Sequence, residues 1–229
     1  MRILKVATLV AAVTVASAPG IAGAAPKNYC ADLKGVDNDQ TCQILMSEPS
    51  YQVNISFPSD YPDLKAVADY VSQTRDGFLN VARSSTPLDV PYELDITATS
   101  YDSAIPPRGT QSLVLQTYEN IGGAHPATLF KAFNWDQAFR KPITFDTLWQ
   151  PGSDPLKVVF PIVVSELQKQ TGQPVFVDPI AGMDPANYQD FAITNDGVIF
   201  FFSQGELLPE AAGATQILVP RAAIDPLLA

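Results

Sequence analysis

The clearest folding signal in the chain is a hairpin, which reads Phe191-Ala192-Ile193-Thr194-Asn195-Asp196-Gly197-Val198-Ile199-Phe200-Phe201-Phe202. Two apolar segments flank Asn195-Asp196-Gly197, a combination typical of a tight turn between antiparallel strands. The segment Val198–Phe202 has no polar alternation, which predicts a strand buried on both faces. Core packing explains its three phenylalanines better than a ligand-binding stripe does. This part of the chain is therefore expected to fold by local strand pairing.

Further strands are predicted on both sides of this hairpin. Gln216–Val219 is expected to be the last strand. Upstream, Ser112–Glu119 and Thr128–Trp135 flank Gly122-Gly123 and are expected to form a second hairpin. Two earlier segments alternate apolar and polar residues, as half-buried strands do, and these are Tyr51–Phe57 and Tyr92–Ala98.

Two long helices are also predicted. Pro62 suits the first turn of a helix, and this helix is expected to end at Ser84-Ser85-Thr86-Pro87. Its apolar face is formed by residues at helical spacing: Leu64, Val67, Val71, Phe78 and Val81. A second apolar face from Leu156 to Leu167 predicts a helix ending near Gly172, with Pro161 in its first turn or at a kink. Local hairpins with two main helices favour an α+β fold with antiparallel or mixed sheets over a wound parallel sheet.

The N-terminus has the layout of a secretory signal peptide. Arg2 and Lys5 precede an uncharged apolar run, and small residues at Ala22 and Ala24 suit cleavage before Ala25. This run is too short to cross the roughly 30 Å hydrocarbon core of a bilayer. We therefore expect a signal peptide over residues 1–24, secretion to the outside of the cell, and no transmembrane anchor.

The mature region is expected to form one domain or two intimate subdomains. Ile105-Pro106-Pro107-Arg108-Gly109 has the composition of a turn or linker. It divides the region into an N-terminal α+β part, 25–105, and a C-terminal α+β part, 106–229, which contains the Gly-Gly-Ala-His-Pro block. Loss of the signal peptide removes two basic residues and changes the formal charge from −10 to −12. Such an acidic surface repels phosphate backbones, so nucleic-acid binding is not expected.

The chain has two cysteines, Cys30 and Cys42. Export exposes them to an oxidising environment, where a structural disulfide is favoured. A redox or metal pair is the alternative, but the spacing is not that of a CxxC motif and no histidine lies nearby. The pair is therefore expected to form an N-terminal disulfide.

Catalytic and metal-binding patterns are sparse. His125 is the single histidine, which excludes any site that needs two from this chain, and no metal site or cofactor is expected. His125 could act as a general base, but no nucleophile motif accompanies it, and a packing role in the glycine-rich turn is favoured. Asp37-Asn38-Asp39 is too short for a calcium loop. Two carboxylates could support glycoside hydrolysis, and the candidates are Asp136, Asp146, Asp190 and Asp196.

Four blocks of the chain stand out, namely Ala25-Pro26-Lys27-Asn28-Tyr29-Cys30, Ala104–Gln111, Thr194–Phe202 and Gly205–Gly213. Together they resemble the secreted immunogenic protein family of mycobacteria, the 64-type antigens. The blocks Gly122–Pro126, Ile143–Trp149 and Pro209–Gly213 also resemble a domain of unknown function. That domain is found in anti-sigma factor ectodomains and beside polysaccharide deacetylase domains. The resemblance implies no deacetylase activity here, because such a metal site needs more than one histidine.

The resemblance implies a secreted, immunogenic mycobacterial protein that meets the host outside the cell. A non-enzymatic extracellular binding protein is the favoured function, and an exported carboxylate-dependent hydrolase of cell-wall or host glycans is the alternative. A host protein, lysozyme or a cell-wall glycan is the expected partner, and the oligomeric state is left open. Since loops carry function disproportionately, the candidate ligand-binding residues are Arg108, Gly122, Gly123 and His125.

Overall fold

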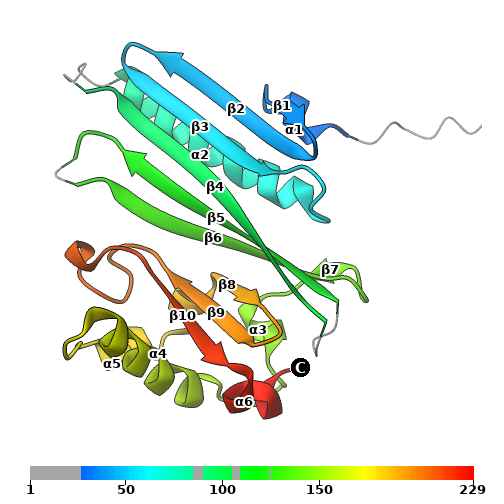
Figure 1. Cartoon of the computed structure of the whole chain (residues 1–229), viewed down its shortest axis with the longest axis vertical. Helices are drawn as coiled ribbons and strands as arrows, with labels where there is room; N and C mark the ends of the chain where they lie inside the picture. Colours follow the sequence, from blue (N-terminus) through cyan, green and yellow to red (C-terminus); the bar gives the residue numbers. More distant parts are fainter. Residues whose placement is uncertain (1–26, 85–89, 105–108, 124) are drawn as a thin grey trace, which may run out of the picture.

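The computed structural model describes residues 27–84, 90–104, 109–123 and 125–229 (Figure 1). Its largest element is a seven-stranded sheet whose strands follow one another in chain order. These strands are β1 (Val36–Asn38), β2 (Thr41–Glu48), β3 (Tyr51–Pro58), β4 (Tyr92–Ser103), β5 (Thr110–Asn120), β6 (Ala127–Asp136) and β7 (Lys141–Pro142). Neighbouring strands are antiparallel except β3 and β4, which are parallel. The predicted α+β class with a mixed sheet is confirmed.

One face of the large sheet is covered by helix α2 (Leu64–Ser84), which makes the crossover between β3 and β4. Strand β3 has the predicted alternation, because every second residue from Tyr51 to Phe57 is buried. Val67, Val71 and Phe78 of α2 pack on this face, while Val81, expected to join them, is 37% exposed. Figure 1 shows α2 behind the strands, with the opposite face of β2–β4 uncovered.

The predicted C-terminal hairpin forms the centre of a second, three-stranded sheet. It consists of β8 (Phe191–Ile193), β9 (Gly197–Phe202) and β10 (Thr215–Pro220), with β9 in the middle. Helix α4 (Leu156–Thr171) packs against it and ends at Gly172, whose φ of 68° lies in the left-handed region that glycine accepts readily. Pro161 lies inside this helix. Short helices complete the structure: α1 (Tyr29–Asp32), α3 (Phe145–Leu148), α5 (Pro179–Gly182) and α6 (Arg221–Ile224).

The two sheets meet at a small apolar junction, formed by Val114 and Ala132 of the large sheet and Ala192 and Phe201 of the small one. Polar side chains extend the junction along the free edge of β6, where they accept backbone N–H groups. Asp190 accepts from Ala132 (2.8 Å), Ser203 from Phe130 (3.0 Å) and Gln204 from Thr128 (3.1 Å). An unpaired strand edge invites pairing with another chain, and these side chains close most of it.

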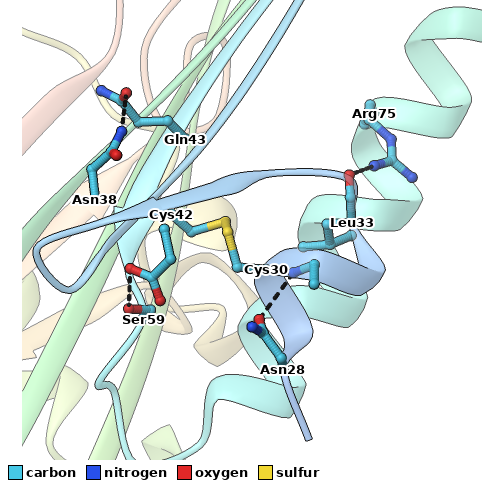
Figure 2. The surroundings of a disulfide bond; sticks show 10 residues. Asn28, Cys30, Leu33, Asn38, Cys42, Gln43, Ser59 and Arg75 are labelled. Carbon is cyan, nitrogen blue, oxygen red and sulfur yellow. Dashed lines mark hydrogen bonds between the residues drawn. A yellow bond between two sulfur atoms is a disulfide. The ribbon is translucent and has the colours of Figure 1, made fainter.

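The predicted disulfide joins Cys30 of α1 to Cys42 of β2 (Figure 2), with a Cα–Cα distance of 5.6 Å. Both residues are at least 99% buried. Around it, Asn28 caps α1 by accepting the N–H of Ala31, and Arg75 of α2 donates to the carbonyl of Leu33 at 2.9 Å. The disulfide therefore fixes the N-terminal helix to the sheet, and the Arg75 hydrogen bond fixes it to α2.

The predicted signal peptide, 1–24, and most of the expected linker, 105–108, lie outside the described residues. On either side of that linker, β4 and β5 pair from Ser103↔Thr110 to Glu93↔Asn120, so the two expected parts share one sheet. The division into 25–105 and 106–229 stays a proposal. Within the described ranges, no helix is long and apolar enough to cross a membrane.

Candidate functional site

The glycine-rich turn between β5 and β6 places the predicted binding residues on the surface. Gly122, Gly123 and His125 are exposed, and the side chain of Asn120 accepts the N–H of Gly122. Among the described residues, His125 makes no hydrogen bond or ion pair, and Arg108 lies outside the described ranges. The packing role of His125 in the turn stays a prediction, and the turn remains a proposed binding element.

The four predicted carboxylates lie on different elements of the structure. Asp136 caps its own turn by accepting the N–H groups of Ala138 and Phe139. Asp146 is exposed in the first turn of α3, and Asp196 lies at the tip of the β8–β9 hairpin. Asp190 stands apart from them at the sheet junction, where its neighbouring acid is Glu206. The described residues contain no group of three metal-ligating side chains.

Asp190 and Glu206 belong to a polar cluster that holds the two sheets together. Asp190 Oδ1 accepts from Lys131 Nζ at 3.1 Å, and Glu206 Oε2 accepts the N–H of Ser203 at 2.7 Å. Burial, opposed by the Ser203 hydrogen bond, raises the pKa of Glu206, and the nearby Asp190 raises it further. Asp190 Oδ1 and Glu206 Oε2 therefore each accept a hydrogen bond within the junction.

The raised pKa of Glu206 leads to a stability prediction for Glu206→Gln. A carboxyl whose pKa is raised on folding contributes stability at low pH that is lost as the pH rises through the folded value. The amide keeps an acceptor for Ser203 and removes the charge. We expect the variant to match the wild type near pH 4 and to exceed it at pH 7 by about 1 kcal/mol or less.

Thermal unfolding of the mature protein between pH 4 and pH 7 measures this difference. Glu210→Gln is the matched control, because Glu210 is exposed and its replacement changes the net charge equally. A destabilised Glu206→Gln protein at pH 7 would contradict the burial argument.

A cleft of about 280 Å³ lies beside this cluster, where the start of α2 approaches β6 and β7. It is called the Tyr61 cleft here. Its walls come from three places: Tyr61 and Asp63 ahead of α2, Phe133 and Asn134 on β6, and Ile143 after β7. Lys131 and Gln189 also line it. The cleft therefore lies beside the edge of β6, between α2 and the connection that leads into the small sheet.

Two buried polar atoms in these walls have no hydrogen-bond partner among the described residues. They are Oη of Tyr61 and Oδ1 of Asn134, on side chains that are 8% and 5% exposed. Asn134 Nδ2 donates to the carbonyl of Phe191 at 2.8 Å, which fixes the amide and leaves Oδ1 as the unused acceptor. A buried polar atom without a partner costs about 1–3 kcal/mol, and such exceptions need an explanation.

Neither Tyr61 nor Asn134 was a predicted site residue. Asn134 is a polar residue inside an otherwise apolar strand, between Phe133 and Trp135, and that interruption was the available signal. Tyr61 carries no comparable signal, since it precedes Pro62 in what reads as a turn. Both residues line the Tyr61 cleft, which forms only through the packing of α2 on the sheet.

Comparison with known proteins first gives one matching family model and two solved structures of similar fold. Residues 146–222 match the model of the family described as a protein of unknown function, DUF3298. A DUF3298 family protein from Pseudomonas aeruginosa PAO1 has a similar fold, with a TM-score of 0.57, 14% identity, and coverage of 84% of this chain and 96% of that one. A DUF3298 member from Bacteroides fragilis has a TM-score of 0.53, 14% identity, and coverage of 82% and 93%.

The sequence relatives then define the particular family. The chain is 64% identical over 229 residues to Immunogenic protein MPT64 of Mycobacterium tuberculosis and Immunogenic protein MPB64 of Mycobacterium bovis, covering all of each. It is 49% identical over 228 residues to Esterase Rv3036c of M. tuberculosis, covering 99% of each chain. The chain belongs to the MPB64/MPT64 immunogenic protein family, as the sequence resemblance predicted.

Proposed function

We propose that this protein is secreted and acts outside the cell by binding a partner and not by catalysis. Its full-length similarity to proteins named as immunogenic supports a role at the interface with a host. The predicted signal peptide over 1–24 supports release. A host protein, lysozyme or a cell-wall ligand is the proposed partner, reached through the Gly122–Pro126 turn, Arg108 or the Tyr61 cleft.

One observation carries the binding role: His125, the single histidine of the chain, lies away from Ser203, the serine that bonds Glu206. Ser203 Oγ accepts the N–H of Phe130, whereas His125 precedes the first residue of β6. The extended segment from Ala127 to Phe130 alone spans about 10 Å. A serine nucleophile and its base must lie within hydrogen-bond reach of each other, so these two residues do not form a catalytic pair.

Ester hydrolysis is the second candidate function, and the similarity to a protein named as an esterase favours it. We expect the mature protein to hydrolyse p-nitrophenyl butyrate no faster than buffer, and Ser203→Ala and His125→Ala to give the same rate. Saturable turnover that either substitution abolishes would replace binding by catalysis as the proposed function.

The binding role is tested by calorimetric titration of the mature protein with lysozyme and with soluble cell-wall glycan. We expect saturable binding to at least one of them. Heat signals at the level of dilution for both would remove these two partners from the proposal.

A further inference from the structure

Strand β10 lies at one side of the small sheet and has an open outer edge (Figure 1). The opposite edge of this sheet, on β8, is closed, because the N–H of Ile193 donates to Ser112 Oγ at 3.0 Å. Among the described residues, β10 pairs with no strand on its outer side, and the bond that reaches this side runs from Gln170 Nε2 to the carbonyl of Gln216 at 3.0 Å. An open strand edge is a template for pairing with another chain.

The backbone groups of Gln216 and Leu218 point to this outer side. In an antiparallel sheet, the N–H and C=O of one residue point to the same neighbouring strand, and the next residue points to the other. Phe201 of β9 donates its N–H to the segment just before β8, so Phe200 points to β10, where it is opposite Ile217. Ile217 therefore points to β9. The N–H groups of Gln216 and Leu218 and the carbonyl of Leu218 face outward, without a partner among the described residues.

A groove of about 450 Å³ lies along this edge and is called the β10 groove here. It is lined by Tyr101 of β4, Ile199 of β9, Gln216 and Leu218 of β10, and Glu166 and Gln170 of α4. Leu218 is 42% exposed, and Tyr101 and Ile199 are half-buried. The groove therefore combines outward backbone groups with apolar side chains, which is what an added strand needs for affinity and for selectivity.

The pleat of β10 decides which side chains of an added strand meet which wall. Ile217 and Val219 are buried in one apolar cluster with α4, whereas Leu218 points to the opposite face. In an antiparallel pair, the residue opposite Leu218 shares its face and exchanges both backbone hydrogen bonds with it. Alternate residues of the added strand thus lie beside the apolar Leu218, and the others lie on the side of α4 and Glu166.

The charges around the groove favour a basic segment. Glu166 is the charged residue of its wall, and the bond from Lys169 Nζ to Glu166 Oε1 at 2.6 Å offsets part of that charge. No Lys or Arg occurs in strands β2–β5 or β8–β10, whereas β4 carries Glu93 and Asp95. A second copy of this acidic chain would bring the same negative charge to the groove, so a basic partner fits better than the β10 of another copy.

We propose that the β10 groove binds an extended basic segment of a partner protein, which pairs antiparallel with β10 as a fourth strand of the small sheet. Apolar residues of the segment lie beside Leu218, and its basic residues, alternating with them, lie on the side of Glu166. This inference rests on the proposed binding function and adds a surface and a partner chemistry to it.

The test is a titration of the isotope-labelled mature protein with a synthetic peptide of about nine residues that alternates Lys and Val, long enough to span β10. We expect saturable amide NMR shifts at Gln216 and Leu218, and none with a copy that has Glu in place of Lys. The Val residues use their N–H groups to bond β10, so a copy N-methylated at Val should bind at least about tenfold more weakly. A copy N-methylated at Lys should bind as the parent peptide does.

Leu218→Lys and Leu45→Lys form a matched pair of variants. Both leucines are exposed on strands, at 42% and 69%, and both substitutions change the net charge equally. A lysine on a strand edge opposes pairing, and here it also repels the basic peptide and removes the apolar contact. Leu218→Lys should weaken binding about tenfold or more, whereas Leu45→Lys, on β2 and outside the groove, should leave it within about twofold.

Four results would overturn the inference. The Lys-Val peptide gives no saturable shifts at β10, or the two N-methylated copies bind equally, or the two lysine variants lose equal affinity, which would make net charge the cause. Shifts at Gln216 and Leu218 that depend on protein concentration without peptide would assign the groove to a second copy. Each result leaves the proposed function standing if lysozyme or cell-wall glycan still binds in calorimetry. Ester turnover without any saturable binding would instead overturn the proposed function.

Discussion

Gly197→Ala is expected to destabilise the protein by about 3 kcal/mol or more, because an added Cβ has no space. A Cβ built on Gly197 would lie 2.1 Å from the carbonyl oxygen of Val219 and 2.9 Å from the N–H nitrogen of Arg221. Both neighbours are backbone atoms, one at the end of β10 and one at the start of α6, so they cannot turn away as a flexible side chain could. Overpacking in a well-packed interior typically costs 1–3 kcal/mol, and backbone contacts this short lie beyond the usual range.

The contact matters because it joins the hairpin turn to the last strand. The N–H of Arg221 donates to the carbonyl of Asp196 at 2.8 Å, and Gly197 donates to Thr194 Oγ1 at 3.2 Å. Moving Gly197 would disturb its strand pairing with Pro220. It would also disturb the buried Arg221 side chain, which donates to the carbonyls of Thr194 and Asn195. We therefore expect the loss to spread through the whole small sheet.

Gly152→Ala separates this steric effect from the conformational freedom of glycine. Gly152 has a φ of 81°, so alanine there is strained, but an added Cβ meets nothing within 4 Å. Its replacement is expected to cost about 1–2 kcal/mol, the strain of an L-residue in the left-handed region. Urea denaturation of the two variants gives the comparison. Equal losses would show that the approach of Val219 does not restrict residue 197.

The sequence predicts those parts of this fold whose signals are local. The Asn195-Asp196-Gly197 turn marks the β8–β9 hairpin, and the alternation from Tyr51 to Phe57 marks a half-buried strand. Gly172 marks the end of α4, where the structure has a residue in the left-handed conformation. In each example the pattern and the structure it specifies lie within a few residues of each other.

The β1–β2 hairpin shows where local signals are insufficient. Its two turn residues, Asp39 and Gln40, have φ values of 48° and 69°, a conformation normally indicated by glycine or asparagine. The disulfide can therefore be predicted from the sequence, but the strand pair that it lies beside cannot.

The sheet junction and the candidate site could not be predicted for a different reason. Asp190 bonds the N–H of Ala132, and Asn134 bonds the carbonyl of Phe191, across separations of 58 and 57 residues. A single sequence contains no information on which distant strand edges meet. The Tyr61 cleft depends on a similar long-range contact, between the start of α2 and β6, so its two unpaired atoms become visible only in three dimensions.

Removal of the disulfide is expected to have the second large effect, a loss of about 3 kcal/mol for Cys30→Ser with Cys42→Ser. The bond closes a loop with a sequence separation of 12, and cross-linking such a loop restricts the unfolded chain by about this amount. For a protein of this size the loss corresponds to a fall in Tm of about 6–12 °C. Thermal unfolding of the oxidised protein and the double variant measures it.

Gly35 provides the means to show that the effect acts at the disulfide itself. A Cβ on Gly35 would lie 2.7 Å from Cys42 Sγ and 2.8 Å from Cys30 Sγ, so Gly35→Ala should destabilise the oxidised protein. In the double serine variant the two side chains are not bonded and can move apart, so the same substitution should cost less. The difference between the two costs is the coupling energy of a mutant cycle.

If the costs are equal, or if the double serine variant loses less than about 1 kcal/mol, the disulfide does not act as the constraint proposed. The hydrogen bond that Arg75 donates to the carbonyl of Leu33 would then be a contact that holds α1 in place.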